Sequence, residues 1–159
     1  MLLRLILFFV LNFGALGIGG FFTGPGVSSD WYQNLTKAPW TPPGWVFGAA
    51  WTTIMICFSI YMAFAWEKIE NRNLLIGLYA AQLILNIAWN PVFFYSQNVL
   101  FGLVVISSLT ILVGWFLIGY WNELKIISLL VLPYFIWLVI ATSLNAYIFQ
   151  NNYLLTVIL

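Results

Sequence analysis

The stretch WYQNLTKAPWTPPGWVFGAAW, from Trp31 to Trp51, contains four of the nine tryptophans and three of the six prolines of the chain. Proline fixes φ at about −65° and favours an extended conformation for the preceding residue, so residues 38–43 are predicted to be non-helical. The pair Pro42 and Pro43 then leads into an apolar run that begins at Trp45. We therefore predict a structured loop that continues directly into a membrane helix.

This aromatic loop has two interpretations. It could cap a ligand site between helices, or its rings could form the belt of Trp and Tyr that many membrane proteins place at the headgroup level. A belt explains the tryptophans but not the prolines between them. From this stretch alone, both interpretations stay open.

The composition is that of an integral membrane protein. Hydrophobic residues make up 64% of the chain and charged residues only 6%, far less charge than a soluble surface carries. The net charge of +1 offers no basic surface for nucleic acid. The chain has no histidine, and its one cysteine, Cys57, lies in an apolar run, so the usual ligands of zinc and haem iron are missing. We expect no bound metal.

Five apolar runs are long enough to cross a hydrocarbon core of about 30 Å. For the first run a secretory signal peptide is the alternative, but no clear cleavage site with a polar start follows it, so we expect a retained helix. The sequence thus predicts an all-α membrane bundle in one domain, residues 1–159. Its helices span residues 5–22, 46–66, 74–95, 99–121 and 126–149, and a capping loop spans about residues 23–45.

The third predicted span carries three amides, Gln82, Asn86 and Asn90, on one helical face. Amides facing lipid cost about 2 kcal/mol or more each, so this face should point into the bundle. For Gln82 we expect an ordinary hydrogen bond between helices. Asn86 and Asn90, beside Trp89, are candidates for the wall of a pocket, with interhelical bonding as the alternative.

The fifth predicted span contains Pro133, which should kink it. Beyond the proline, Trp137, Ala141 and Asn145 share one face. A large ring one turn from a small residue forms a step that a flat ligand could fill. Ordinary packing of a large residue against a small one is the alternative.

The distribution of positive charge predicts the orientation of the chain. With five spans, four of the five Lys and Arg fall on the side of the amino terminus and only Lys37 falls on the other. The positive-inside rule then places the amino terminus in the cytoplasm and the capping loop outside. The four are Arg4, Lys68, Arg72 and Lys125.

Small residues spaced four apart predict close helix contacts. Gly77 and Ala81 form one such pair, and Ala15 and Gly19 form another. We predict a homodimer through the first pair, with the second pair as the second choice.

Three motifs in this chain resemble those of the TspO/translocator protein family, also known as the peripheral benzodiazepine receptors. The first is KAPWTPPGWVFG at residues 37–48, followed by Trp51. The second is LNIAWNP at residues 85–91, and the third is LPYFIW at residues 132–137 with Leu144 and Asn145. The three motifs occur in the order typical of this family and cover nearly the whole chain, so the chain resembles a bacterial member of the family.

This resemblance implies a five-helix bundle with a pocket near one membrane face, closed by the loop between the first two helices. It implies binding of porphyrins such as protoporphyrin IX and of isoquinoline- and benzodiazepine-type ligands, with no required cofactor. Bacterial members promote light- and oxygen-dependent breakdown of the porphyrin, and Trp51 and Trp137 match the tryptophans implicated. The ligand-binding residues that we expect are Tyr32, Trp40, Pro42, Phe47, Gly48, Trp51, Asn86, Trp89, Asn90, Trp137, Ala141 and Asn145. The chain departs from the animal cholesterol motif, because no Lys or Arg follows Tyr147.

Two other functions compete with photo-oxidative breakdown in the bacterial cell membrane. One is transport or export of porphyrins or small hydrophobic molecules, and the other is ligand-binding stress sensing. Against ion-coupled transport, the spans carry no charge except Arg4 and Glu67 at helix ends. The predicted bundle contains no pair of carboxylates, so the sequence gives no indication of a hydrolase.

Overall fold

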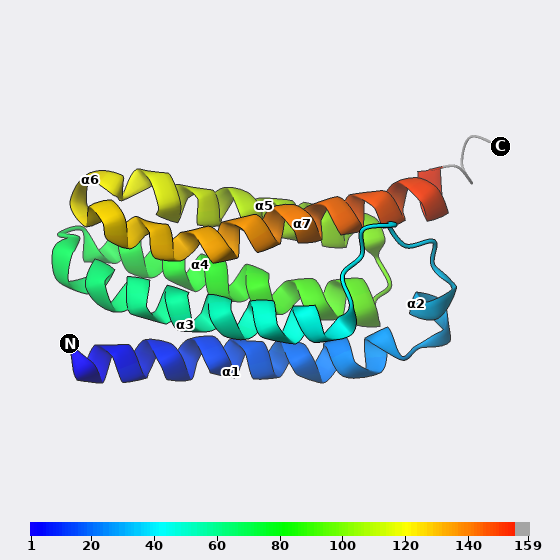
Figure 1. The fold of residues 1–159 in the computed structure, drawn as a ribbon, viewed down its shortest axis with the longest axis horizontal. Coiled ribbons are helices and arrows are strands. Elements are labelled where there is room, and N and C mark those ends of the chain that lie inside the picture. Colours follow the sequence, from blue (N-terminus) through cyan, green and yellow to red (C-terminus); the bar gives the residue numbers. More distant parts are fainter. Residues whose placement is uncertain (155–159) are drawn as a thin grey trace.

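A computed structural model describes residues 1–154, and five long helices run side by side through it (Figure 1). The five membrane-spanning segments are α1 (Leu2–Val27), α3 (Gly44–Lys68), α4 (Arg72–Asn90) with the π-helical η1 (Pro91–Tyr95), α5 (Val99–Gly119), and a last segment, Trp121–Leu154. This last segment joins α6 (Trp121–Leu124), the 3₁₀ helix η2 (Lys125–Val131), α7 (Leu132–Phe149) and the π-helical η3 (Gln150–Leu154). The predicted all-α, multi-pass membrane bundle is confirmed.

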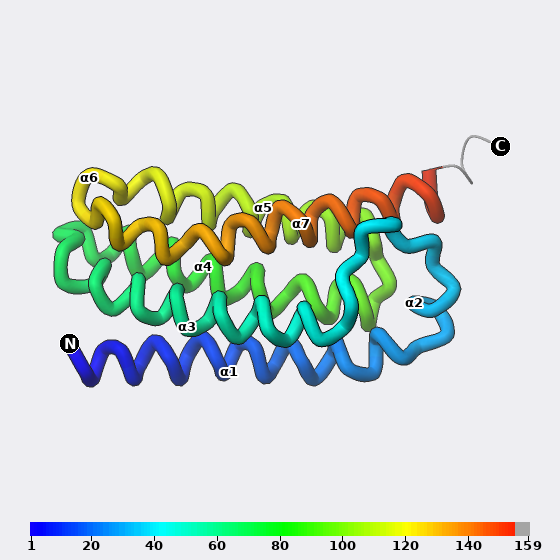
Figure 2. The backbone as a smooth tube through the Cα atoms, viewed as in Figure 1, coloured from blue at the N-terminus to red at the C-terminus, as the bar shows by residue number. Residues whose placement is uncertain are grey.

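The bundle has two distinct ends. The amino terminus and the α3–α4 turn lie at one, which we call the amino-terminal end (Figure 1). Residues 28–43, which we call the cap, lie at the other and include the short helix α2 (Asp30–Asn34). Figure 2 shows the cap running from α1 up to α7 before it returns to α3. Residues 36–43 are non-helical, as the prolines predicted.

Polar side chains begin three of the helices. Ser29 accepts a hydrogen bond from the Tyr32 amide at the start of α2, Asn71 accepts one from Leu74 in α4, and Asn98 accepts one from Phe101 in α5. Each satisfies an amide that has no partner within the helix. Turn residues therefore set where these helices begin.

Rings and buried polar bonds hold the spans together. Phe58, Tyr61, Phe116 and Tyr134 are fully buried, and the Tyr61 hydroxyl donates to the Phe116 carbonyl at 2.7 Å, which links α3 to α5. Gln82 of α4 donates to the Tyr134 hydroxyl of α7 at 2.8 Å. The bond between helices that we expected for Gln82 is therefore present.

A second buried polar group connects the first three spans. Asn12 of α1 donates to the Ser59 hydroxyl of α3 at 2.8 Å and accepts from the Tyr79 hydroxyl of α4 at 2.9 Å. All three residues are buried. This network fixes α1 against its two neighbours within the bilayer region.

Two helix boundaries differ from the sequence prediction. The first helix continues through Pro25 to Val27, because a proline in the last turn removes only one hydrogen bond and Gly26 packs against Phe94 of η1. The fifth span begins at Trp121, before the predicted residue 126, and η2 precedes α7 in it. Pro133 stands in the first turn of α7, where its missing N–H costs nothing, and a kink there stays a prediction.

The two small-residue pairs face different surroundings. Ala15 and Gly19 are buried, and a Cβ on Gly19 would lie 2.7 Å from Nδ2 of Asn90, so this pair serves packing of α1 on α4 within the chain. Gly77 is exposed on α4, and nothing lies within 4 Å of where its Cβ would be. The predicted homodimer through Gly77 and Ala81 stays a prediction.

Candidate functional site

A groove of about 340 Å³ runs between α3 and α7. Two of the five α3 residues that line it are alanines, Ala49 and Ala50. Their side chains end at Cβ and leave space between α3 and α7. The groove opens to the outside of the bundle through exposed residues such as Ala49, Thr53 and Ile136. Its lining residues are Val46, Ala49, Ala50, Thr53, Ile54, Pro133, Ile136, Trp137 and Ile140.

Aromatic rings of the two helices meet beside this groove. Trp137 lines it while remaining only 6% exposed, and Phe47 packs edge-on against Trp137 with ring centroids 5.1 Å apart. One turn further along α3, Trp51 packs edge-on against the buried ring of Tyr134 at 5.9 Å. The spacing of four residues on α3 and three on α7 puts each pair on one helix face. Of these four rings, Trp137 lines the groove, and it offers an aromatic surface on which a flat ligand could stack.

The cap closes over α7 next to the end of the groove. Trp40 donates from Nε1 to the Ser143 hydroxyl at 3.2 Å, and its ring packs edge-on against Tyr147 at 5.2 Å. Ser143 in turn donates to the carbonyl of Ile140, which lines the groove. Trp40 of the cap thus contacts α7 one turn beyond the groove.

The other half of the cap rests on a second aromatic cluster. Trp31 and Tyr32 pack against Phe93 of η1 at 5.6 and 6.4 Å, and Trp89 stacks on Phe93 at 5.1 Å. Burial raises the pKa of the Tyr32 phenol, so it stays neutral at physiological pH. The ammonium of Lys37 lies 4.7 Å above the Tyr32 ring, a cation–π contact within the cap.

The predicted amides are largely engaged in hydrogen bonds between helices. Asn90 accepts from the Thr23 hydroxyl of α1 at 2.6 Å, and Asn145 accepts from the Trp89 indole at 3.1 Å while donating to the Val99 carbonyl at 2.9 Å. Asn86 is 7% exposed, and its backbone carbonyl accepts a hydrogen bond from the side-chain amide of Asn90. The alternative of bonding between helices therefore describes Asn90, and Asn145 also forms such bonds, whereas contact of either residue with a ligand stays a prediction.

The expected ligand-binding residues fall into separate places. Trp137 lines the α3–α7 groove, Phe47 and Trp51 lie beside it on α3, and Ala141 lies partly buried one turn beyond Trp137. A second group, on the α1, α4 and α5 side of the bundle, comprises Tyr32, Asn86, Trp89, Asn90 and Asn145. Three more belong to the cap or to the first turns of α3: Trp40, Pro42 and Gly48. The twelve do not surround one enclosed cavity.

Several residues of the groove were not among those expected. Tyr134 lies three positions before Trp137, so helical periodicity could have placed it beside the same site. Ala49 and Ala50 create the hollow, but alanines carry no chemical signal in a sequence. Among residues 1–154 no cluster of three His, Cys, Asp or Glu is arranged to hold a metal ion.

The geometry can be compared with known proteins. A model of the TspO/MBR family matches residues 5–150. The tryptophan-rich protein TspO of Archaeoglobus fulgidus is 39% identical, over 87% of this chain and 90% of that protein. The tryptophan-rich sensory protein of Cereibacter sphaeroides is 34% identical over 73% of each chain, and the human translocator protein is 29% identical over 77% of this chain and 75% of its own length.

Proposed function

Because the chain belongs to the TspO/MBR family, we propose that it binds a tetrapyrrole such as protoporphyrin IX in the bacterial cell membrane and promotes its breakdown by light and oxygen. The observation that carries this proposal is Trp137, an indole that lines an open apolar groove and is held there by Phe47. No cofactor is required, since the porphyrin itself absorbs the light.

Binding follows from the character of the groove. Its volume lies near the lower end of small-molecule sites, and it is open on one side, so the edge of a larger flat ring can extend into lipid. Stacking on aromatic rings is worth about 0.5–1.5 kcal/mol per pair beyond the burial of apolar area. Isoquinoline- and benzodiazepine-type molecules are aromatic and largely apolar, and they would enter the same groove.

The chemistry would rest on the indoles. Indole is the most easily oxidised aromatic side chain in the chain, so an excited porphyrin on Trp137 has an electron donor in contact with it. Trp51 is a second indole nearby, one turn along α3 from Phe47, which contacts Trp137. The reduced porphyrin passes this electron to oxygen dissolved in the bilayer, which becomes superoxide. The oxidised indole then takes an electron from the porphyrin, so the porphyrin is oxidised overall and oxygen is the terminal oxidant. We assign the catalytic role to Trp51 and Trp137.

The test is the absorbance of protoporphyrin IX mixed with purified protein, in the dark and under illumination. We expect a bound spectrum in the dark, and loss of porphyrin only when light, oxygen and protein are all present. Stable binding without loss of porphyrin would instead favour sensing, a function that matches the name of the tryptophan-rich sensory protein of Cereibacter sphaeroides. No binding at all would exclude the proposal.

A groove-filling variant locates the binding. Ala49 is an exposed groove residue, so Ala49→Trp places a ring in the hollow without disturbing the core. Because the new ring removes at least one stacking and burial contact, we expect porphyrin to bind at least tenfold more weakly. A tenfold loss of affinity corresponds to about 1.4 kcal/mol. Val10→Trp, at an exposed position of α1 outside the groove, is the control and should bind as the unmodified protein does. Equal binding by both variants would remove the groove from the proposal.

A further inference from the structure

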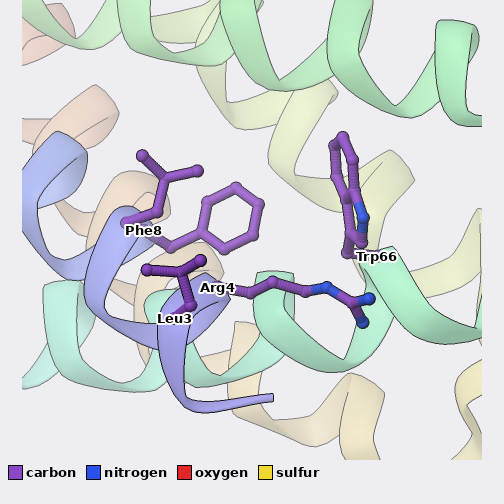
Figure 3. Close-up of a pocket in the computed structure, with 5 residues that line it drawn as sticks. Leu3, Arg4, Phe8 and Trp66 are labelled. Carbon is purple, nitrogen blue, oxygen red and sulfur yellow. The ribbon is translucent and has the colours of Figure 1, made fainter.

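A notch of about 150 Å³ lies between α1 and α3 at the amino-terminal end, away from the α3–α7 groove. Figure 3 shows Arg4 extended from α1 toward Trp66 of α3, with Phe8 and Leu3 beside it. The notch is lined by Leu3, Arg4, Leu7, Phe8 and Trp66. It combines an apolar surface with a cation at its rim.

The apolar part of the notch faces outward. Leu3 is 80% exposed and Leu7 is 53% exposed, while Phe8 forms the buried floor, with its ring centroid 6.4 Å from that of Trp66. In a membrane protein, these exposed leucines contact hydrocarbon. The notch is therefore shaped to hold part of an acyl chain.

The polar rim has positive charge to spare. The Arg4 guanidinium carries five N–H donors, and one of its nitrogens donates to the Glu67 carboxylate at 2.9 Å, so further N–H groups remain for a ligand. The Arg72 guanidinium lies 5.4 Å from the Trp66 ring centroid, and no carboxylate of the described residues forms an ion pair with it. Two guanidinium groups thus lie near Trp66, and only that of Arg4 pairs with a carboxylate among the described residues.

The Trp66 indole supplies a second, independent feature. Its N–H has no acceptor among the described residues, although Trp66 is only partly exposed. An unpaired donor at the edge of a bilayer favours a bound oxygen. A tryptophan that served only in an aromatic belt would need neither the notch nor the two arginines.

We propose that this notch binds one anionic phospholipid. Its phosphate accepts hydrogen bonds from Arg4, Arg72 and the Trp66 indole, and its acyl chain lies along Leu3 and Leu7. Guanidinium groups match the geometry of phosphate oxygens, and the net negative charge of the lipid complements the positive rim. The lipid would come from the leaflet on the amino-terminal side, which the positive-inside rule makes cytoplasmic.

Native mass spectrometry of the purified full chain tests this site. The protein is equilibrated in detergent with equal amounts of phosphatidylglycerol and phosphatidylcholine, and the retained lipids are counted. We expect one phosphatidylglycerol retained in preference to phosphatidylcholine. Arg72→Gln should weaken retention about fivefold, the effect of one basic residue near a membrane surface.

Two further variants separate the parts of the site. Trp66→Phe keeps the ring and removes the N–H donor, and Leu7→Trp fills the apolar notch without a change of charge, so each should lower retention. Lys125→Gln, which removes a positive charge from η2 at the same end of the bundle, should leave it unchanged. Equal retention of the two lipids, or an equal loss in Lys125→Gln and Arg72→Gln, would overturn the proposal in favour of nonspecific surface attraction. None of these outcomes depends on porphyrin.

Discussion

The indole nitrogen of Trp89 donates a hydrogen bond of 3.1 Å to the amide oxygen of Asn145, which joins α4 to α7. The same Asn145 donates to the Val99 carbonyl at the start of α5, so one amide connects three spans. Polar groups without a partner in a bilayer cannot turn to water. Loss of this amide should therefore affect all three helices.

Asn145→Ala should lower the thermal stability of the purified protein. It leaves the Trp89 N–H without its acceptor and creates a small cavity, a change that we expect to cost about 1–3 kcal/mol. The measurement is thermal unfolding in detergent. Asn151→Ala is the matched control, since Asn151 bonds only the Tyr147 carbonyl of its own chain segment, and a similar shift in both variants would show that Asn145 has no special role.

The cap should depend on Asn152 for its position. The Asn152 amide accepts from the Thr36 backbone N–H at 2.8 Å and donates to the Thr36 carbonyl at 3.1 Å, which fastens the cap to η3. Asn152→Ala should loosen this contact. Because Lys37 is the only Lys or Arg in the cap, trypsin should cut there several times faster in the variant.

Asn151→Ala again serves as the control for this experiment. Intact protein and the two fragments are separated by gel electrophoresis after timed digestion. An unchanged rate of cutting at Lys37 in Asn152→Ala would show that Trp40 and the Trp31–Tyr32 contacts hold the cap without the amide.

Much of this architecture could be read from the sequence, because the bilayer imposes it. Apolar runs of sufficient length must be helical across lipid, and the prolines at 39, 42 and 43 exclude helix from residues 38–43 of the cap. Helix ends were less predictable. Gly24 and Pro25 are typical of a turn, yet α1 continues through them because Gly26 meets Phe94, a contact that local sequence does not reveal.

The candidate site was harder to predict for a similar reason. Periodicity placed Trp137, Ala141 and Asn145 on one face, but it could not say that Asn145 turns to Trp89 whereas Trp137 lines the groove. The groove is lined on α3 by Ala49 and Ala50, whose small side chains leave space between the helices. Nothing in the sequence marks these two alanines as part of a site. Side-chain partners across helices depend on packing that periodicity alone does not fix.

The orientation of the chain gives a further prediction. Four of its five Lys and Arg lie at the amino-terminal end, and Lys37 in the cap is the fifth. A reporter fused after Leu159 should therefore be active only in a form that requires export. Activity from a cytoplasmic reporter at the same position would reverse the orientation that we propose.

Assembly should depend on the exposed face of α4. Gly77→Leu adds a bulky side chain where a second copy would approach Gly77 and Ala81, so we expect a shift from dimer to monomer in detergent. Light scattering measures the mass. Gly20→Leu, at another exposed glycine with open space around it on α1, is the control and should leave the mass unchanged. An unchanged mass in Gly77→Leu would exclude this face of α4 as the interface.

The last prediction concerns the chemistry that we propose for Trp51 and Trp137. Replacement of either indole by Phe keeps an aromatic surface in the same place, so porphyrin should still bind, with a loss of affinity of no more than about tenfold. Phenylalanine is much harder to oxidise than indole, so light-driven loss of protoporphyrin should fall several-fold in each variant. Trp137→Phe should have the larger effect, because Trp137 lines the groove whereas Trp51 packs against Tyr134.

The comparison must be made at equal occupancy and equal illumination, so that weaker binding is not mistaken for slower chemistry. Trp121→Phe is the matched control: Trp121 begins α6 at the amino-terminal end and is 43% exposed, too far from the groove to exchange electrons with a ligand there. Its rate should equal that of the unmodified protein. If all three variants degraded bound porphyrin at the unmodified rate, the indoles would only pack the ligand, and breakdown would be photochemistry of the porphyrin itself with no catalytic role for the protein.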